Sequence, residues 1–134
     1  MSLHVELVSP EALVWSGDVD SVLLRTIGGG DIQFLTGHAP VLAALDICVI
    51  EMGLSDGTVE RVAVRGGFVE VSDDHVKILS DQGIRADHVD PDAARSERDR
   101  AQELMGRVET ELARSEAAED MKWSTVQLRS VGAE

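Results

Sequence analysis

Hydrophobic and polar residues alternate in short runs along the first 80 or so residues of the chain. Residues 3–7 place apolar side chains at every second position, the period-two pattern of a half-buried strand. Further β-rich runs cover residues 13–15, 19–26, 47–50, 59–64, 66–71 and 76–79, and turns are predicted at Ser16-Gly17-Asp18, Asp56-Gly57 and Asp73-Asp74. Many short strands with frequent turns are typical of a closed sandwich or barrel. We expect an all-β sandwich of about ten short strands over residues 1–86.

A glycine-rich stretch over residues 28–45, GGGDIQFLTGHAPVLAAL, interrupts this alternation. It predicts a short strand, a rigid corner at residues 36–40, and a second apolar segment. Pro40 fixes its own φ and biases Ala39 toward extended backbone, while the glycines permit tight turns. His38 is the one polar residue in an unusual setting here, and from the pattern alone it is a loop histidine.

After about residue 88 the pattern becomes helical. Asp90-Pro91 is a helix start, with Asp as N-cap and Pro at the first helical position. Two apolar stripes follow at helical spacing: Ala94, Ala101, Met105, Val108 and Leu112, and then Ala117, Met121, Leu128 and Val131. The stripes are out of phase, which predicts a bend between Gly106 and Glu116. We therefore expect an antiparallel αα-hairpin over residues 87–134, a linker at about 81–89, and an α+β protein as a whole.

Composition and charge narrow the classes of partner. The formal net charge of −13 argues against nucleic acid, and the 3% aromatic content argues against stacking platforms for bases. A single cysteine, Cys48, excludes an intramolecular disulfide. The N-terminus lacks the basic region of a secretory signal. The longest nearly apolar run, residues 39–50, is too short to span a membrane, so we expect no direct bilayer insertion.

The residue pattern offers no catalytic or metal-binding motif. The four histidines show no metal-ligand spacing, and the triple glycine is not followed by the Lys-Ser/Thr of a phosphate loop. No Gly-x-Ser-x-Gly elbow is present. With 25 carboxylates on a small surface, any chosen pair is expected to be a solvated pair. The residues alone indicate a non-catalytic interaction module without a metal.

Several segments together resemble one protein family along nearly the whole chain. Residues 30–42, GDIQFLTGHAPVL, resemble the G-[DE]-[IL]-x-x-L-x-G-H-A-P-L-L segment of the epsilon subunits of bacterial F-type ATP synthases, the counterparts of the mitochondrial delta subunit. Residues 15–17 resemble the family's [FW]-x-G turn, 64–71 its V-x-G-G-F-[LV]-E-V, 76–79 its V-x-[IV]-L, and 126–129 its A-Q-L-R. The positions that this resemblance makes structural signatures are Gly30, Leu35, Gly37, Pro40, Gly66, Gly67 and Phe68.

The resemblance implies a non-catalytic rotor subunit of a proton-translocating ATP synthase, peripheral at the cytoplasmic face of the bacterial plasma membrane. It implies a sandwich that binds the gamma subunit and the c-ring, and a hairpin that inhibits ATP hydrolysis by reaching the catalytic α/β subunits. By position, Asp31, Gly37 and His38 fall on loops that face the c-ring. Lys122 and Arg129 are the candidate inhibitory contacts.

The chain departs from the family pattern at a few positions. Gln33 and Thr36 stand where glycine and proline are usual, and both are tolerable in a strand and a turn. Some family members bind ATP through [IL]-D-x-x-R-A. Here Asp90 and Ala94 are present but Ala93 replaces the arginine, so we expect no cofactor. The alternative to the rotor subunit is a free-standing β-sandwich that binds a ligand and carries a helical tail.

Overall fold

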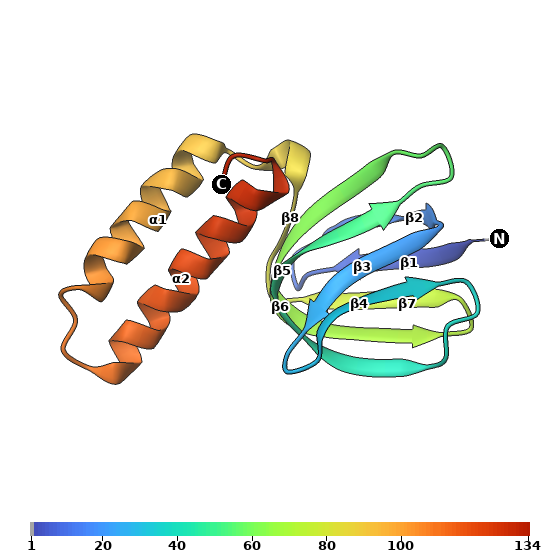
Figure 1. The fold of residues 1–134 in the computed structure, drawn as a ribbon, viewed down its shortest axis with the longest axis horizontal. Helices are drawn as coiled ribbons and strands as arrows, with labels where there is room; N and C mark the ends of the chain where they lie inside the picture. The colour runs from blue at the N-terminus through green and yellow to red at the C-terminus, as the bar shows by residue number, and fades with distance from the viewer. Residues whose placement is uncertain (1) are drawn as a thin grey trace.

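The computed structural model describes residues 2–134 as a β-sandwich with a two-helix hairpin at one end (Figure 1). Its strands are β1 (Leu3–Val8), β2 (Leu13–Val19), β3 (Ser21–Thr26), β4 (Gly30–Leu35), β5 (Val41–Gly53), β6 (Val59–Ser72), β7 (His75–Ser80) and β8 (Gly83–Arg85). A 3₁₀ turn (Ala86–His88) leads to helices α1 (Pro91–Met105) and α2 (Glu111–Ser130). The α+β class predicted from the sequence is confirmed.

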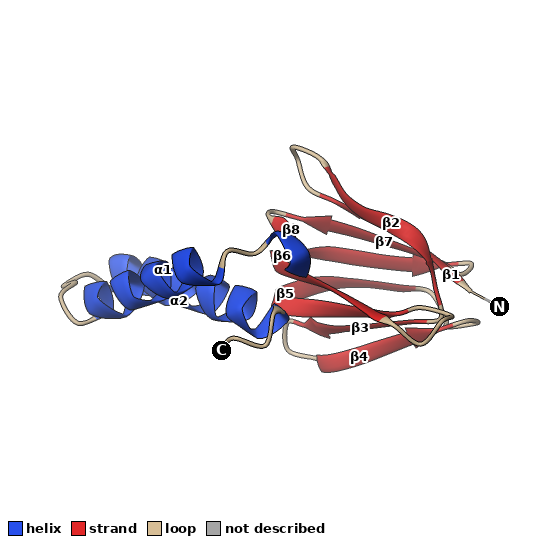
Figure 2. Ribbon diagram, turned by 90° about the horizontal axis from the view of Figure 1, so that it is seen from above, coloured by secondary structure: helices blue, strands red, loops and turns tan. Residues whose placement is uncertain are grey.

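Two long strands hold the sandwich together. The hydrogen-bonded order is β2-β1-β7-β6-β5-β3-β4, with β8 paired to β6. The second half of β6 pairs with β7, and its first half pairs with β8, while β5 follows β6 along its length. Within residues 2–134 the strands number eight rather than about ten, because the segments expected as separate short strands join into β5 and β6 (Figure 2).

The change of layer along β6 occurs at Gly66 and Gly67. Both have positive φ, +74° and +123°, and a Cβ on Gly67 would lie 1.9 Å from the carbonyl oxygen of Leu79. Only glycine fits this close approach of two backbones. The paired glycines are therefore required by the geometry of the strand.

The predicted alternation builds the core. Leu3, Val5 and Leu7 are fully buried, as predicted for the inward side of β1. The rest of this core is aliphatic apart from Phe34, Met52 and Cys48, in line with the low aromatic content. Apolar burial of this kind is the main stabilising term of the sandwich.

The turn predictions have mixed outcomes. The hairpin turns at Asp56-Gly57 and Asp73-Asp74 are confirmed, and both Asp73 and Asp74 adopt positive φ. The turn predicted at residues 16–18 is wrong, because β2 runs straight through Gly17. The ring of Trp15 lies over Gly17, where a Cβ would be 3.0 Å from the ring. This glycine makes room for an aromatic side chain and does not reverse the chain.

Side-chain caps begin both helices. The Asp90 carboxylate accepts hydrogen bonds from the backbone N–H groups of residues 92 and 93, and Pro91 occupies the first helical position, as predicted. Thr110 caps α2 in the same way. Residues 106–110 separate the helices, inside the predicted interval. The apolar-stripe position given to Leu112 is wrong, since this side chain is 71% exposed beyond the bend.

The hairpin rests on the sandwich through α2. Trp123 and Val126 of α2 are buried against Ala63, with Ile47 and Val49 packed around them. Helix α1 packs against α2 and lies away from the strands (Figures 1 and 2). The division at residue 86 stays a prediction, although the larger core lies entirely within residues 3–78.

Gly67→Ala tests the strand bend. The new methyl group would strike backbone at a positive φ, so we expect a loss of about 3 kcal/mol or more in the free energy of unfolding. Gly28→Ala is the matched control, because Gly28 has φ +78° but open space around its Cβ position. It should cost only about 1 kcal/mol. Urea unfolding measures both, and equal losses would contradict the steric explanation.

Candidate functional site

The outer face of the sandwich carries a row of apolar side chains across four strands and the turn after β3. Val8 is the register partner of Leu79, Leu79 of Phe68, and Phe68 of Ala44. Ile27 extends the row, since its N–H donates to the Ala44 carbonyl at 2.9 Å. We call these five residues the apolar band. Cross-strand neighbours of this kind lie side by side on one face of a sheet.

The apolar band is exposed. Phe68 is 55% exposed, Leu79 49% and Ile27 67%. Val69, which follows Phe68, and Ile78, which precedes Leu79, are fully buried in the core. Leu42, two residues before Ala44, adds a side chain that is 75% exposed. Exposed apolar side chains that are neighbours across several strands mark a surface for contact with another molecule.

Hollows border the apolar band on both sides. A cleft of about 530 Å³ separates Phe68 and Ile27 from Lys122 and Glu119 of α2. A smaller hollow of about 280 Å³ lies among Val8, Pro10, Phe68 and Leu79 and is mostly apolar. Each hollow is large enough to receive side chains of a partner. The surface at the apolar band is therefore hollowed as well as apolar.

The corner after β4 is held rigidly. Gly37 has φ +85°, and its N–H donates to the Asp74 carboxylate at 2.7 Å. The half-buried ring of His38 meets the buried ring of Phe34 edge to face, with centroids 4.9 Å apart. His38 Nδ1 lies 2.7 Å from the Ala39 carbonyl oxygen. The corner therefore presents His38 in a fixed orientation.

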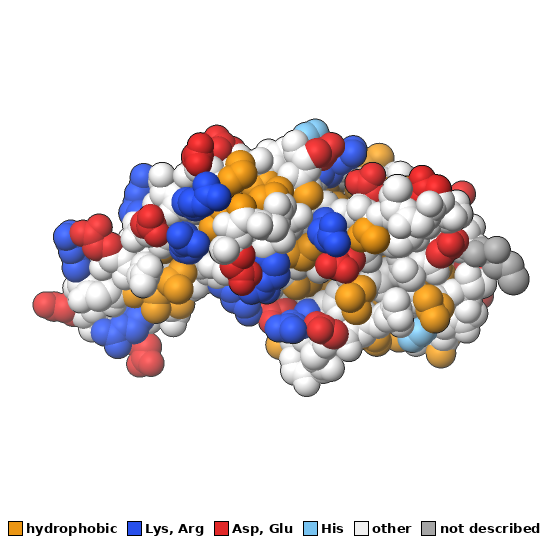
Figure 3. Space-filling model, turned by 45° about the horizontal axis from the view of Figure 1, so that its top comes forward, with side chains coloured by type: hydrophobic (Ala, Val, Ile, Leu, Met, Phe, Trp, Pro, Cys, Tyr) orange, Lys and Arg blue, Asp and Glu red, His pale blue; other side chains and the backbone are white. Residues whose placement is uncertain are grey.

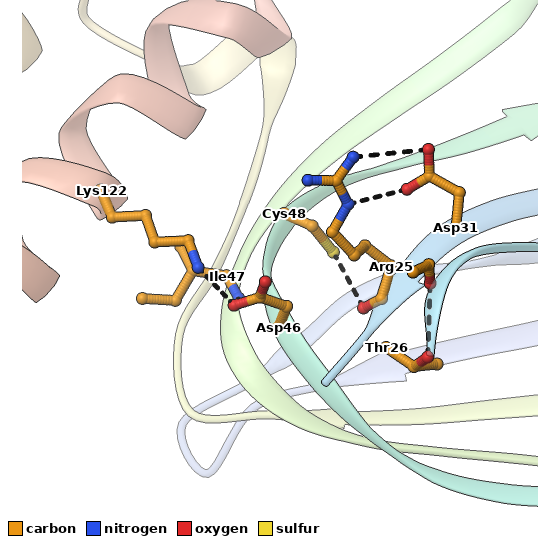
Figure 4. Close-up of polar contacts among 8 residues, drawn as sticks. Arg25, Thr26, Asp31, Asp46, Ile47, Cys48 and Lys122 are labelled. Atoms are coloured by element: carbon orange, nitrogen blue, oxygen red, sulfur yellow. Dashed lines mark hydrogen bonds and ion pairs between the residues drawn. The ribbon is translucent and has the colours of Figure 1, made fainter. Parts of the chain in front are cut away.

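Asp31 lies at the other end of β4 from this corner. It faces Arg25 of β3, whose Nε donates to its carboxylate at 2.8 Å (Figure 4). This hydrogen bond lowers the pKa of Asp31. Asp31 and His38, which the resemblance places together on the c-ring side, therefore lie at opposite ends of edge strand β4 and are separated by its length.

The basic residues predicted as inhibitory contacts both have partners within the chain. Lys122 Nζ lies 2.6 Å from Asp46 Oδ1 of β5 (Figure 4). Arg129 binds Glu134 with both Nε and Nη2, at 2.7 and 3.2 Å, and these bonds raise the pKa of Arg129. In this arrangement of the hairpin neither cation is free for another subunit.

The positions of the degenerate ATP motif line a separate cleft of about 480 Å³. Ala93 supplies no positive charge there, and the Asp90 carboxylate is engaged in capping α1. Glu11, Asp81 and Glu97 also line the cleft. A wall of carboxylates repels a triphosphate, so the arrangement disfavours the ligand that the motif binds elsewhere.

A metal cluster and a membrane-spanning helix are both missing from the described part of the chain. Within residues 2–134 no group of three His, Cys, Asp or Glu side chains is arranged to hold a metal ion. No helix there is long and apolar enough to cross a membrane. Cys48 is a buried free thiol, and burial raises its pKa.

Two positions that the family resemblance marks as structural signatures are exposed in the structure. Leu35 and Phe68, expected as structural signatures, have exposed side chains and do not build the core. Leu79, Ile27 and Val8 were not singled out from the sequence. For Leu79 the signal was the strand alternation itself, since Ile78 and Ser80 on either side of it are buried.

The surface of the hairpin is mixed in charge. On the face in Figure 3, acidic and basic side chains are interspersed over the hairpin, and hydrophobic side chains gather near its junction with the sandwich. One basic residue at this junction, Arg65 of β6, binds two acids of α2: Asp120 at 2.6 Å and Glu119 at 3.3 Å. No local pattern predicts this contact, because its partners are more than 50 residues apart in the sequence.

Comparison with known proteins gives consistent matches. The family model described as ATP synthase, Delta/Epsilon chain, beta-sandwich domain, matches residues 2–86. The ATP synthase epsilon chain of Bacillus subtilis (strain 168) is 39% identical over 104 residues, which are 78% of this chain and 77% of that protein. The cyanelle epsilon chain of Cyanophora paradoxa is 32% identical over 131 residues, 98% of each chain.

Solved structures share the fold. A chain of the Euglena gracilis mitochondrial ATP synthase (OSCP/F1/c-ring) aligns with a TM-score of 0.83 at 17% identity, over 97% of this chain and 81% of that one. A chain of the Tetrahymena thermophila mitochondrial ATP synthase central stalk and c-ring aligns with a TM-score of 0.65 at 14% identity, over 98% and 97%. At these identities the likeness concerns the fold alone.

The Asp31–Arg25 pair predicts a measurable pH effect. Because the folded-state pKa of Asp31 lies below its ordinary 3.8, its ionised form stabilises the fold above that value, and the contribution is lost as pH falls through the lowered pKa. An NMR titration of the Asp31 carboxyl carbon should show a midpoint below the ordinary value. Arg25→Gln should return it toward that value. An unchanged midpoint in this variant would remove Arg25 as the cause.

Proposed function

The chain belongs to the ATP synthase delta/epsilon family, and from this premise we propose that it is the epsilon subunit in the central stalk of a proton-translocating F-type ATP synthase. In this role it performs no chemistry of its own. The sandwich joins gamma to the c-ring, and the hairpin restrains ATP hydrolysis. The single observation that carries the proposal is the match of residues 2–86 to the family's sandwich domain, on which the exposed apolar band lies.

The apolar band is the surface that we assign to gamma. It is a contiguous apolar surface bordered by hollows, and such a surface binds a partner by removing hydrophobic area from water. Charged residues, Glu70 and Lys77 among them, flank it in the cross-strand register. Polar residues around an apolar centre are the usual composition of a protein interface.

Edge strand β4 is the part that we assign to the c-ring. Asp31 at its start and Gly37 beyond its end are exposed, and His38 beside Gly37 is half-buried. A single partner can touch both ends only if it lies along the strand. Asp31 is already paired with Arg25, so a basic group of the ring would join an existing pair.

The hairpin is the part that we assign to regulation. Lys122 and Arg129 reach acidic residues of the catalytic α/β subunits only after leaving Asp46 and Glu134. The arrangement described here is therefore the non-inhibitory one. The subunit works as a peripheral component at the cytoplasmic face of the membrane, and no observation favours a free-standing ligand-binding module.

Phe68→Glu tests the gamma contact. A charge in the centre of the apolar band should weaken binding of purified gamma by at least about tenfold, because burying an unpaired carboxylate is costly. Leu112→Glu is the matched control, since Leu112 is also exposed but lies on the hairpin. Calorimetric titration of both variants should separate them, and equal affinities would count against the band.

Deletion of residues 87–134 tests the regulatory role. The truncated subunit should still assemble, because the apolar band and the larger core lie within residues 3–79. ATP hydrolysis by the reconstituted enzyme should rise severalfold while synthesis persists. Hydrolysis no faster than in the intact enzyme would contradict inhibition by the hairpin.

ATP binding can be tested on the isolated chain. We expect no binding at submillimolar ATP, because carboxylates line the motif's cleft and Ala93 supplies no guanidinium. Isothermal calorimetry measures this directly. A dissociation constant well below a millimolar would show that Arg95 or Arg98 has taken over the arginine's role.

A further inference from the structure

Two sets of ion pairs join α2 to the sandwich with opposite polarity. In one, the basic group is on the helix: Lys122 Nζ contacts Asp46 Oδ1 at 2.6 Å. In the other it is on the sandwich: Arg65 Nη2 contacts Asp120 Oδ1 at 2.6 Å, and its Nε contacts Glu119 at 3.3 Å. Each face of the contact therefore carries both signs of charge.

The sandwich half of this network is fixed in place. Asp46 Oδ1 also accepts the backbone N–H of Ile47 at 2.8 Å, and Ile47 is the register partner of Arg65. The side chains of Asp46 and Arg65 are 26% and 23% exposed, less than those of the helix acids. Burial lowers the pKa of Arg65, but the bonds to Asp120 and Glu119 outweigh it and raise the pKa overall.

The sandwich side and the α2 side of this network each carry both a positive and a negative side chain. On the sandwich, Asp46 of β5 precedes Ile47, the register partner of Arg65 on β6, so one acid and one base lie on neighbouring strands. On α2, Glu119 and Lys122 are three residues apart, a spacing at which side chains of opposite charge pair on one helix face. Neither half is left with a single unmatched sign when the two separate.

We propose that these residues form a charge-exchange latch that sets the docked position of the hairpin and allows its release without stranding a charge. When the hairpin docks, ion pairs within α2 and within the sandwich are replaced by ion pairs between α2 and the sandwich. A shift of α2 by one turn, about 5.4 Å, breaks all three contacts, so the latch fixes the register. The apolar contact of Trp123 and Val126 supplies adhesion, and the latch supplies position.

The regulatory meaning of the latch rests on the proposed function, but the latch itself is a property of the isolated chain. Its failure in the test below would leave the family role standing. Conversely, a chain that does not bind gamma could still hold its hairpin in this way. The two proposals are therefore separable by experiment.

Trp123 reports hairpin release. It is buried at the interface, and the only other tryptophan of the chain is Trp15. In a Trp15→Phe background, the urea midpoint for acrylamide quenching of Trp123 follows loss of the contact, whether or not the sandwich unfolds in the same step. A Trp123→Phe protein that keeps Trp15 gives the sandwich midpoint for comparison.

Charge reversal then tests the latch. Lys122→Asp and Asp46→Lys should each lower the midpoint, corresponding to a loss of about two- to fivefold in the docked population. The swapped double variant should recover most of that loss, as a double-mutant cycle requires for a direct pair. Arg95→Glu, which alters a pair wholly within α1, is the matched control and should leave the Trp123 midpoint unchanged.

The salt dependence of the midpoint is a second test. It can be measured on the unsubstituted protein even if a charge-reversed variant does not fold. The midpoint of the unreversed protein should depend little on salt, because release exchanges ion pairs and does not abolish them. The single reversals should approach it as salt rises and the Debye length falls to about 3 Å at 1 M. No recovery in the swapped variant, or a midpoint of the unreversed protein that falls steeply with salt, would overturn the proposal.

Discussion

The steric constraint at Gly66-Gly67 governs the rest of the structure. Because the backbone of β6 passes within contact of Leu79, no side chain fits at Gly67, and the strand changes layer there. The residues on either side of the two glycines therefore face different surroundings. Arg65 faces α2, and Phe68 turns outward beside Leu79. One backbone feature thus separates a contact within the chain from an exposed apolar surface.

This separation explains how a small acidic protein can serve as a mechanical link. The sandwich has its own aliphatic core and needs no contribution from the hairpin to form the apolar band. The hairpin has a small apolar contact around Trp123 and relies on ion pairs for position. A sandwich with its own core and a hairpin held to it by a small contact suit a subunit of the central stalk.

The strands and helix ends that depend on local sequence could be predicted. Alternation identified the inward side of β1, and Asp90-Pro91 marked the start of α1. Prediction failed where tertiary contacts decide: Gly17 accommodates the Trp15 ring, and Leu112 lies beyond the bend. Phe68 was recognised as a signature but not as an exposed residue. The Arg65 pairs were invisible because side chains so distant in sequence meet only in the folded chain.

A photo-crosslinker at position 68 of the assembled enzyme tests the central claim most directly. If the apolar band is the gamma-binding surface, benzoylphenylalanine in place of Phe68 should crosslink to gamma, and the same group in place of Leu112 should not give that product. Identification of the crosslinked subunit by mass spectrometry reads out the result. A position-68 probe that labels no gamma in an intact, active complex would contradict the account.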